Sequence, residues 1–233
     1  MRVGGWTAIV LIGLCGPIAA RAAETVDAAL VLEVDVSLSV DDKRYELQKE
    51  GIAAAFENPD LAKAIATGTE GAVAVEIIEF SDPDRQIPVI GWTRIATAED
   101  AQALAKRIRS VHRTSRGLTG LADALIAAEE AFADLPYASP RRVVDVSGDG
   151  MSNIGTEITV ARDRLVEAGI TINGLPILSE EPWLETYYTE YVVGGPGAFV
   201  IPAESLDSFA DAMKRKVLQE LVVSALPAKD RRG

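Results

Sequence analysis

The sequence has little of the chemistry on which many enzymes and secreted proteins depend. Its 233 residues include one cysteine, Cys15, and one histidine, His112. Cys15 lies in an N-terminal segment that we expect to be removed, which would leave no disulfide and no thiol in the mature protein. His112 stands among arginines and has no recognisable partner, so no Ser/His/Asp triad can be assembled. These absences predict a protein that has no catalytic residues and is not an enzyme.

The sequence also has no long hydrophobic run. The apolar stretch over residues 6–14 is shorter than the roughly 20 residues that a membrane-spanning helix requires. It follows a basic residue, Arg2, and precedes Ala20-Arg21-Ala22, a pattern typical of a secretory signal peptide that is cleaved before Ala23. We therefore expect a signal peptide over residues 1–22 and a periplasmic or secreted protein without a membrane span.

Positive charge is scarce as well. The chain has 35 Asp and Glu against 23 Lys and Arg, and its formal net charge is −12 at pH 7. Removal of the signal peptide would take away two further positive charges, Arg2 and Arg21. Nucleic acids and anionic membranes both require a basic footprint, so we expect neither as a ligand.

The length and the hydrophobic pattern predict one α/β domain over residues 23–233, with its core at about residues 27–222. Apolar segments of strand length alternate with segments of helical period, which indicates a doubly wound, mostly parallel sheet with helices on both faces. The predicted strands are 28–34, 72–80, 142–146 and 170–175, with a weaker one at 197–201 and a possible antiparallel edge strand at 86–90. The predicted helices are 43–65, 98–111, 121–135, 158–168 and 205–222.

Oxygen-bearing side chains follow three of these segments. The first strand ends in Asp35, and the alternation of an extended chain places Ser37 and Ser39 on the same side as that carboxylate. Thr119 precedes a predicted helix, and Asp149 lies between two glycines after a predicted strand. Ligands of doubly wound folds bind at the carboxyl ends of the strands, so these five side chains are expected to meet there.

Two carboxylates and three hydroxyls form an all-oxygen set of metal ligands. Such a set suits a hard divalent cation, most of all Mg²⁺, with Mn²⁺ or Ca²⁺ as alternatives. Because only two carboxylates offset the charge, the ion would stay electrophilic and attract a further carboxylate. We therefore predict a metal site that captures an Asp or Glu of a protein partner.

At these positions the chain resembles von Willebrand factor type A (VWA) domains. Asp35, Ser37 and Ser39 match the opening motif of the family's metal-ion-dependent adhesion site, Thr119 matches its loop threonine, and Asp149 matches its later acidic residue. Typical members have Thr-Asp-Gly at that last position, whereas Ser147-Gly148 precede Asp149 here. The chain further resembles a group of uncharacterised bacterial exported proteins with a VWA-like domain. The resemblance implies the VWA fold and metal-dependent binding.

Other interpretations stay open. Asp145 could be catalytic, although a hydrogen-bonded structural role fits its apolar strand better. Ser147, Ser152 and Asn153 could support the site or form ordinary turns. Four aromatic residues could form a recognition surface or could pack beneath their own loop: Trp183, Tyr187, Tyr188 and Tyr191.

Two alternative functions also stay open. A metal-assisted hydrolase or phosphatase of the haloacid dehalogenase type would have its nucleophile at Asp35, but it would require a second aspartate where this chain has Ser37. The chain could also be a scaffold whose metal site is vestigial and binds nothing. Such a scaffold would melt at the same temperature with and without a divalent cation.

Overall fold

The fold is known from a computed structural model, which describes residues 23–179 and 181–225. The predicted signal peptide, with Cys15, lies outside the described residues. No helix in the described part of the chain is long and apolar enough to cross a membrane.

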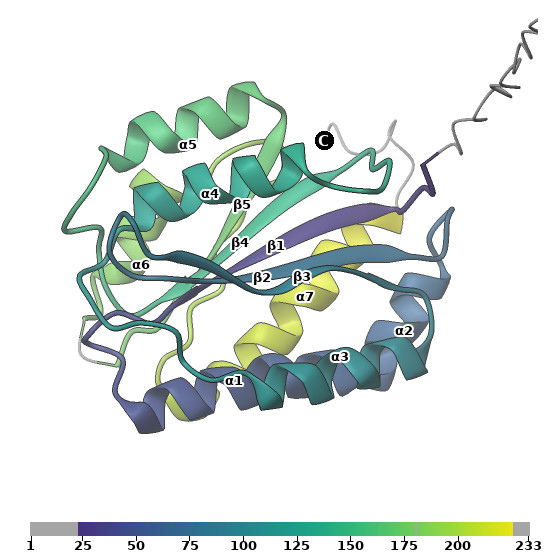
Figure 1. Cartoon of the computed structure of the whole chain (residues 1–233), viewed down its shortest axis with the longest axis horizontal. Coiled ribbons are helices and arrows are strands. Elements are labelled where there is room, and N and C mark those ends of the chain that lie inside the picture. The colour runs from purple at the N-terminus through teal and green to yellow at the C-terminus, as the bar shows by residue number, and fades with distance from the viewer. Residues whose placement is uncertain (1–22, 180, 226–233) are drawn as a thin grey trace, which may run out of the picture.

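The described residues form one sheet of five strands in the order β3-β2-β1-β4-β5 (Figure 1). Its strands are β1 (Ala28–Asp35), β2 (Val73–Phe80), β3 (Gln86–Ile95), β4 (Arg142–Gly148) and β5 (Ile170–Pro176). All neighbouring strands are parallel except β2 and β3, which pair in antiparallel fashion at the edge of the sheet. The predicted mostly parallel α/β sheet and its antiparallel edge strand are confirmed.

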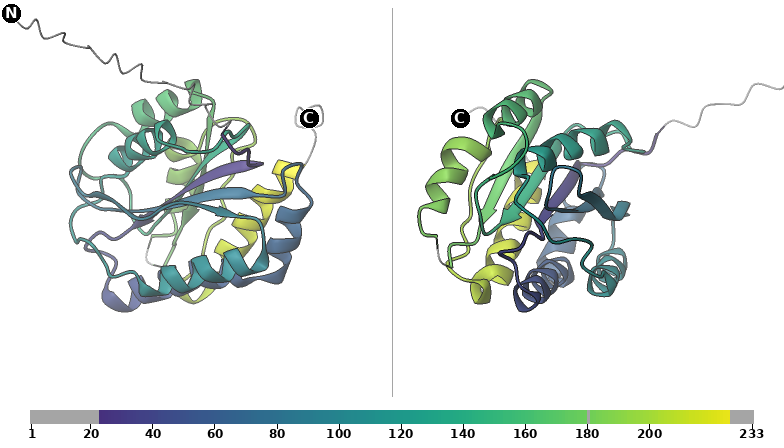
Figure 2. Two further views of the ribbon diagram at one scale, coloured as in Figure 1. Left: turned by 45° about the vertical axis from the view of Figure 1, so that its right-hand side comes forward. Right: turned by 60° about the vertical axis from the view of Figure 1, so that its left-hand side comes forward.

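Helices cover both faces of the sheet (Figures 1 and 2). One face carries α1 (Asp42–Glu57), α2 (Pro59–Ala66), α3 (Ala98–Ser110) and α7 (Phe209–Ala225). The other face carries α4 (Leu121–Ala133), α5 (Ile158–Glu167) and α6 (Leu184–Tyr187), which continues into the π-helical turn η1 (Tyr188–Val192). A short 3₁₀ turn, η2 (Leu206–Ser208), precedes α7. Leu30 and Leu32 of β1 point to the first face and Ala29 and Val31 to the second, so β1 is buried on both sides.

Two predicted elements differ from the structure. The expected helix over 43–65 is two helices, because Asn58 is extended before Pro59 and its side chain accepts a hydrogen bond from Asp60 N, which begins α2. The expected strand over 197–201 is not a strand. Only single bridges join this segment to the sheet, such as the one between Gly174 and Val200, because Gly195 and Gly197 turn the chain with positive φ angles.

Local interactions fix the ends of three helices. The Asp41 side chain accepts a hydrogen bond from Arg44 N at 2.8 Å and caps α1. Thr97 and Asp100 form a reciprocal capping box at the start of α3. Gly169 has a φ of +75° directly after α5, where the turn into β5 requires a left-handed residue.

A buried group of charges joins α7 to the sheet. The Lys216 ammonium of α7 forms ion pairs with Asp145 of β4 and, at 3.2 Å, with Glu220 of α7. Asn173 of β5 donates from Nδ2 to Glu220 Oε1 at 2.7 Å. All four side chains are 0–1% exposed. Asp145 is thus an anchor for α7, which agrees with the structural role preferred from its sequence position.

Glu33 of β1 is expected to make the free energy of unfolding of the protein depend on pH. Its side chain is fully buried, and neither carboxylate oxygen has a hydrogen-bond partner in the described part of the chain. Burial, reinforced by the negative charge of Glu76, raises the pKa of Glu33 well above its usual value of 4.5. The folded state therefore favours the protonated form. The resulting stabilisation is complete below about pH 4.5 and is lost as the pH rises through the folded pKa.

We expect the variant Glu33→Gln to lack this loss, so its stability relative to the wild type should increase with pH. Denaturant unfolding at a series of pH values measures the difference, with Glu167→Gln as an exposed control. A difference between variant and wild type that does not change with pH would contradict the assignment.

Candidate metal centre

The predicted ligands lie at one end of the sheet, where β1 and β4 finish side by side. These strands are parallel and pair up to Val34 and Ser147. Asp35 is the last residue of β1, and Asp149 follows the last residue of β4. Thr119 lies just before α4, in a loop whose Gly117 carbonyl accepts a hydrogen bond from Leu38 N at 2.8 Å. Segments far apart in the sequence therefore meet at this edge.

Hydrogen bonds connect four of the five side chains. Ser37 N donates to Asp35 Oδ1 at 2.8 Å, and the Oγ atoms of Ser37 and Ser39 are 3.1 Å apart. Ser39 Oγ donates to Asp149 Oδ1 at 2.5 Å. Asp35 and Ser37 are buried, and the Asp149 side chain is only 5% exposed. The structure therefore brings both carboxylates and both serines together.

Thr119 is held beside this group by Asn153. Thr119 N donates to Asn153 Oδ1 at 2.9 Å, and Asn153 N donates to the Thr119 carbonyl at 3.0 Å. A Cβ atom on Gly150 would lie 3.7 Å from Thr119 Oγ1, which places the threonine hydroxyl next to the Asp149 loop. Asn153, which the sequence left between two interpretations, supports the threonine.

Close packing surrounds Asp35 on its inner side. A Cβ atom on Gly148 would lie 2.9 Å from Asp35 Oδ2 and 3.0 Å from the Tyr188 hydroxyl. Tyr188 is fully buried, and neither its hydroxyl nor Asp35 Oδ2 has a hydrogen-bond partner among the described residues. Gly148, the departure from the usual VWA motif, therefore makes room for this contact.

Electrostatics at the site disfavour two bare carboxylates. Burial, followed by the negative charge of Asp149, raises the pKa of Asp35 to about 7, although hydrogen bonds from Ser37 and from the Asp149 backbone lower it. Burial and the charge of Asp35 also raise the pKa of Tyr188 well above its usual value. A positive charge placed between these groups would be stabilised.

Two arginines that the sequence did not single out contact the site. Arg44 of α1 donates from Nη1 to Asp149 Oδ2 at 3.1 Å. Arg113 donates from Nη2 to the carbonyls of Val36 and Ser37 at 2.7 and 2.8 Å, which fixes the loop between Asp35 and Ser39. Asp149 is 105 residues from Arg44 along the chain, so no local pattern could have predicted this pair.

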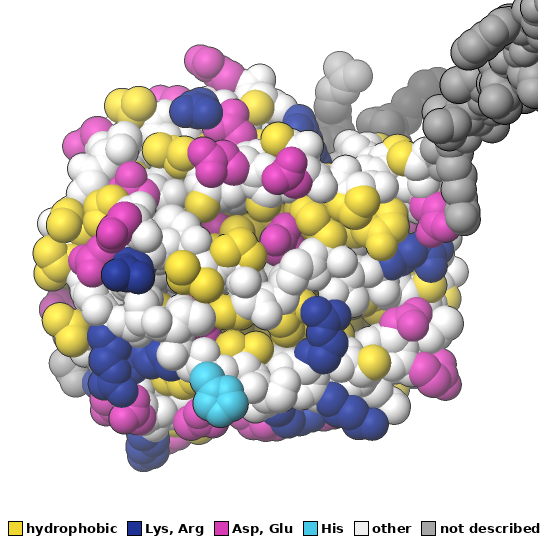
Figure 3. Space-filling model, viewed as in Figure 1, with side chains coloured by type: hydrophobic (Ala, Val, Ile, Leu, Met, Phe, Trp, Pro, Cys, Tyr) yellow, Lys and Arg dark blue, Asp and Glu magenta, His cyan; other side chains and the backbone are white. Residues whose placement is uncertain are grey.

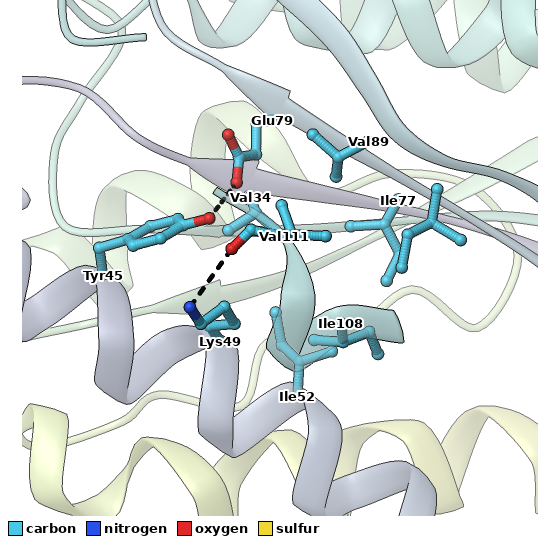
Figure 4. Close-up of a pocket in the computed structure, with 10 residues that line it drawn as sticks. Val34, Tyr45, Lys49, Ile52, Ile77, Glu79, Val89, Ile108 and Val111 are labelled. Atoms are coloured by element: carbon cyan, nitrogen blue, oxygen red, sulfur yellow. Dashed lines mark hydrogen bonds between the residues drawn. The ribbon is translucent and has the colours of Figure 1, made fainter. Parts of the chain in front are cut away.

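Further contacts lie around Arg113, and one of them, between Tyr45 and Glu79, is drawn in Figure 4. Tyr45 donates its hydroxyl to Glu79 Oε1 at 2.7 Å, and Glu79 Oε2 accepts from both N and Oγ1 of Thr114. The Arg113 guanidinium lies over the Tyr45 ring at 5.8 Å. These contacts join α1, β2 and the segment before α4 into one support for the site.

The donor set fits a hard divalent cation. In residues 23–179 and 181–225, no three His, Cys, Asp or Glu side chains are grouped so that they could hold a metal ion. Any ion at the strand ends would therefore depend on hydroxyls for part of its shell. Carboxylate and hydroxyl oxygens suit Mg²⁺, which tolerates such neutral ligands and retains water. Asp35 Oδ2, buried and without a partner, is a free acceptor for it.

The aromatic residues divide between the two interpretations. Tyr188 is fully buried and packs in the core, whereas Trp183 and Tyr191 are 46% and 43% exposed. Tyr187 joins the two sets: its ring lies 5.5 Å from that of Tyr191, and its hydroxyl accepts a hydrogen bond from Ser152 N. An exposed aromatic surface therefore lies beside the loop that follows Asp149.

Comparison with protein families shows to which family the chain belongs. The family model described as "Protein of unknown function (DUF1194)" matches residues 25–225. The chain belongs to this family. A search of curated proteins found no match for the DUF1194 chain.

Solved structures with the same fold are VWA domains. Proximal thread matrix protein 1 from the mussel byssus is 17% identical over 88% of the DUF1194 chain and 49% of its own, with a TM-score of 0.63. A von Willebrand factor type A protein from Catenulispora acidiphila is 17% identical over 86% and 43%, with a TM-score of 0.58. The vWF domain of the type V pilus tip protein Mfa5 from Porphyromonas gingivalis is 13% identical over 88% and 98%, with a TM-score of 0.62.

These similarities establish the VWA fold for the DUF1194 chain. The chain spans about half the length of the mussel protein, and all of the Mfa5 domain but 2%. One structure of the mussel protein has zinc in its metal-ion-dependent adhesion site.

Proposed function

We propose that the protein is an exported binding module that holds a divalent cation at Asp35, Ser37, Ser39, Thr119 and Asp149, and that captures an acidic side chain of a protein partner. The observation that carries this proposal is the meeting of two carboxylates and three hydroxyls at the end of β1 and β4, with a buried, unpartnered oxygen on Asp35. The zinc in the mussel protein's corresponding motif supports a divalent ion in this fold. Mg²⁺ is our first choice, with Mn²⁺ or Ca²⁺ as alternatives.

Exposed hydrophobic side chains around the site favour a protein as the partner. Leu38 lies between the two serines and is 67% exposed, Leu118 precedes Thr119 and is 45% exposed, and Met151 follows Gly150 and is 44% exposed. Each of the three ligand-bearing loops therefore offers one apolar side chain to solvent. An apolar ring with a charged centre is suited to an acidic residue that has hydrophobic neighbours.

Export of the chain remains part of this proposal. The sequence pattern over residues 1–22 supports a cleaved signal peptide, and the pilus protein among the structures of the same fold is consistent with a role outside the cytoplasm. Mass spectrometry of the N-terminus of the protein purified from its native host tests the cleavage. We expect the mature chain to begin at Ala23.

Arg44 is expected to weaken the affinity for the metal. Its guanidinium is bonded to Asp149 Oδ2 and would repel a divalent cation at this distance. The variant Arg44→Gln should therefore bind Mg²⁺ about threefold to tenfold more tightly, since a favourable change of 1.4 kcal/mol is a factor of ten. Calorimetric titration measures the affinity, with Arg94→Gln, on the distant strand β3, as the control. If Arg44→Gln binds Mg²⁺ as tightly as the wild type or more weakly, Arg44 does not compete with the cation for Asp149.

The partner mechanism can be tested separately from the metal. Manganese bound to the protein relaxes its coordinated water protons, and a partner carboxylate that replaces water should reduce this effect. We expect the peptide acetyl-Leu-Glu-Leu-amide to lower the proton relaxation rate saturably, and the glutamine analogue to leave it unchanged. If Mn²⁺ binds but the glutamate peptide has no effect, the capture of an acidic side chain is wrong while the metal site stands.

A further inference from the structure

A groove of about 390 Å³ lies between α4 and the edge strand β3, and one end of it reaches Pro83 and Asp123, near the loop that carries Thr119. Figure 3 shows this face, on which acidic side chains border a strip of hydrophobic ones. The lining of the groove includes Gln86, Trp92 and four acidic residues, Glu76, Asp123, Glu130 and Asp134, and contains no lysine or arginine.

The acidic residues come from two elements that face each other. Asp123 and Glu130 of α4 and Asp134, the C-cap residue of this helix, are seven and four residues apart, which places them on one side of the helix. Glu130 and Asp134 are exposed at the rim. Glu76 comes from β2 and lies at the floor, and its carboxyl group is close enough to Asp134 for their charges to repel.

Glu76 is the observation that distinguishes this groove from an ordinary solvated surface. Its side chain is only 7% exposed, and its Oε2 atom has no hydrogen-bond partner in the described part of the chain. Gln86, which also lines the groove, has a buried Oε1 atom without a partner. Buried acceptors without donors are uncommon, because each costs free energy unless a ligand or water bonds to it.

The chemistry of the lining selects the ligand. Every unpartnered polar atom named above is an acceptor, and an arginine guanidinium carries five donors and no acceptor. Its planar fork can bond to several carboxylates at once, and it stacks on aromatic rings. Trp92, half-buried in the wall, donates its indole N–H to the Ala131 carbonyl at 3.0 Å, so its ring is held in place to receive such a cation.

We propose that this groove is a second binding site, independent of the metal centre, that takes an arginine side chain of a protein or peptide partner. The guanidinium enters between β3 and α4, bonds to Glu76 at the floor and is held by Asp134 and Glu130 at the rim. A protein with both sites would bind a basic residue of its partner in the groove and an acidic residue at the proposed metal centre.

Nuclear magnetic resonance tests the site without the natural partner. The protein, with EDTA present to remove divalent cations, is titrated at physiological ionic strength with acetyl-Ala-Arg-Ala-amide, and shifts of the Trp92 indole N–H and the Glu76 amide are followed. We expect saturable shifts that are confined to the groove. The peptide with citrulline, a neutral isostere of arginine, should produce none.

Variants separate the groove from the general negative charge of the protein. We expect Glu76→Gln to weaken the binding of the arginine peptide about tenfold, and Asp134→Asn to weaken it about threefold. The reason is that hydrogen bonds to a charged group are stronger than those between neutral groups. Glu99→Gln removes an exposed acidic residue from α3, outside the groove, and should change nothing. Shifts spread over the acidic surface, equal binding of the citrulline peptide, or unchanged affinity in both groove variants would each overturn the proposal.

Discussion

Replacement of Lys216 with alanine is expected to lower the free energy of unfolding by about 3–5 kcal/mol, the usual cost of leaving buried charges without their partner. The ammonium is fully buried and forms ion pairs with both Asp145 and Glu220. Without it, two carboxylates would remain beside each other in the core between α7, β4 and β5. Few surface contacts of this protein could have an effect of that size.

Denaturant unfolding of the variant and the wild type measures this change. Lys214→Ala, an exposed lysine two residues earlier in α7, is the matched control and should change stability by less than about 0.5 kcal/mol. Equal effects of the two substitutions would show that the charge group does not anchor α7.

The variant Gly148→Ala is expected to lose about 1–3 kcal/mol of stability, as overpacked cores usually do. Its new methyl group would lie 2.9 Å from Asp35 Oδ2 and 3.0 Å from the Tyr188 hydroxyl, both of which are held in the buried interior. Asp35 or Tyr188 would have to shift, which would change the position of the Asp35 carboxylate relative to the other proposed ligands. We expect Mg²⁺ to raise the melting temperature of the wild type, as the proposed metal site requires, but not that of the variant.

Gly150→Ala provides a stringent control for this prediction. Gly150 is in the same loop, but the nearest atom to its new methyl group would be Thr119 Oγ1 at an ordinary 3.7 Å. Thermal melting with and without Mg²⁺ compares the two variants. If both behave alike, the space at Gly148 is not what positions Asp35.

The sheet and its helices could be predicted from the sequence because each follows from a local pattern. The apolar run before Asp35 and the run over residues 142–146 predict buried parallel strands, and both are strands in the structure, where the second extends to Gly148. Apolar character was insufficient for residues 197–201, where glycines with positive φ prevent a regular ladder. The break at Asn58-Pro59 did have a local signal, since a residue before proline is disfavoured in a helix.

The arrangement of the candidate site could be predicted where its residues follow strands, but not where the residues that contact them come from elsewhere in the fold. Asp35 ends β1 and Asp149 directly follows β4, and the carboxyl ends of these adjacent parallel strands lie side by side. Arg44 and Tyr188 approach from α1 and η1, and their contacts depend on how those helices pack. The acidic groove is likewise a tertiary feature, because Glu76 reads in the sequence as one polar residue in a buried strand.

Calorimetric titration of the metal-stripped protein tests most directly whether the protein binds a divalent cation at the proposed site. Mg²⁺, Mn²⁺ and Ca²⁺ are each titrated into the wild type and into the double variant Asp35→Ala, Ser37→Ala, with circular dichroism to verify that the variant is folded. We predict saturable binding to one site in the wild type, with loss of that binding in the variant. Absence of binding by the wild type, or equal binding by the variant, would contradict the account and leave the fold without this metal site.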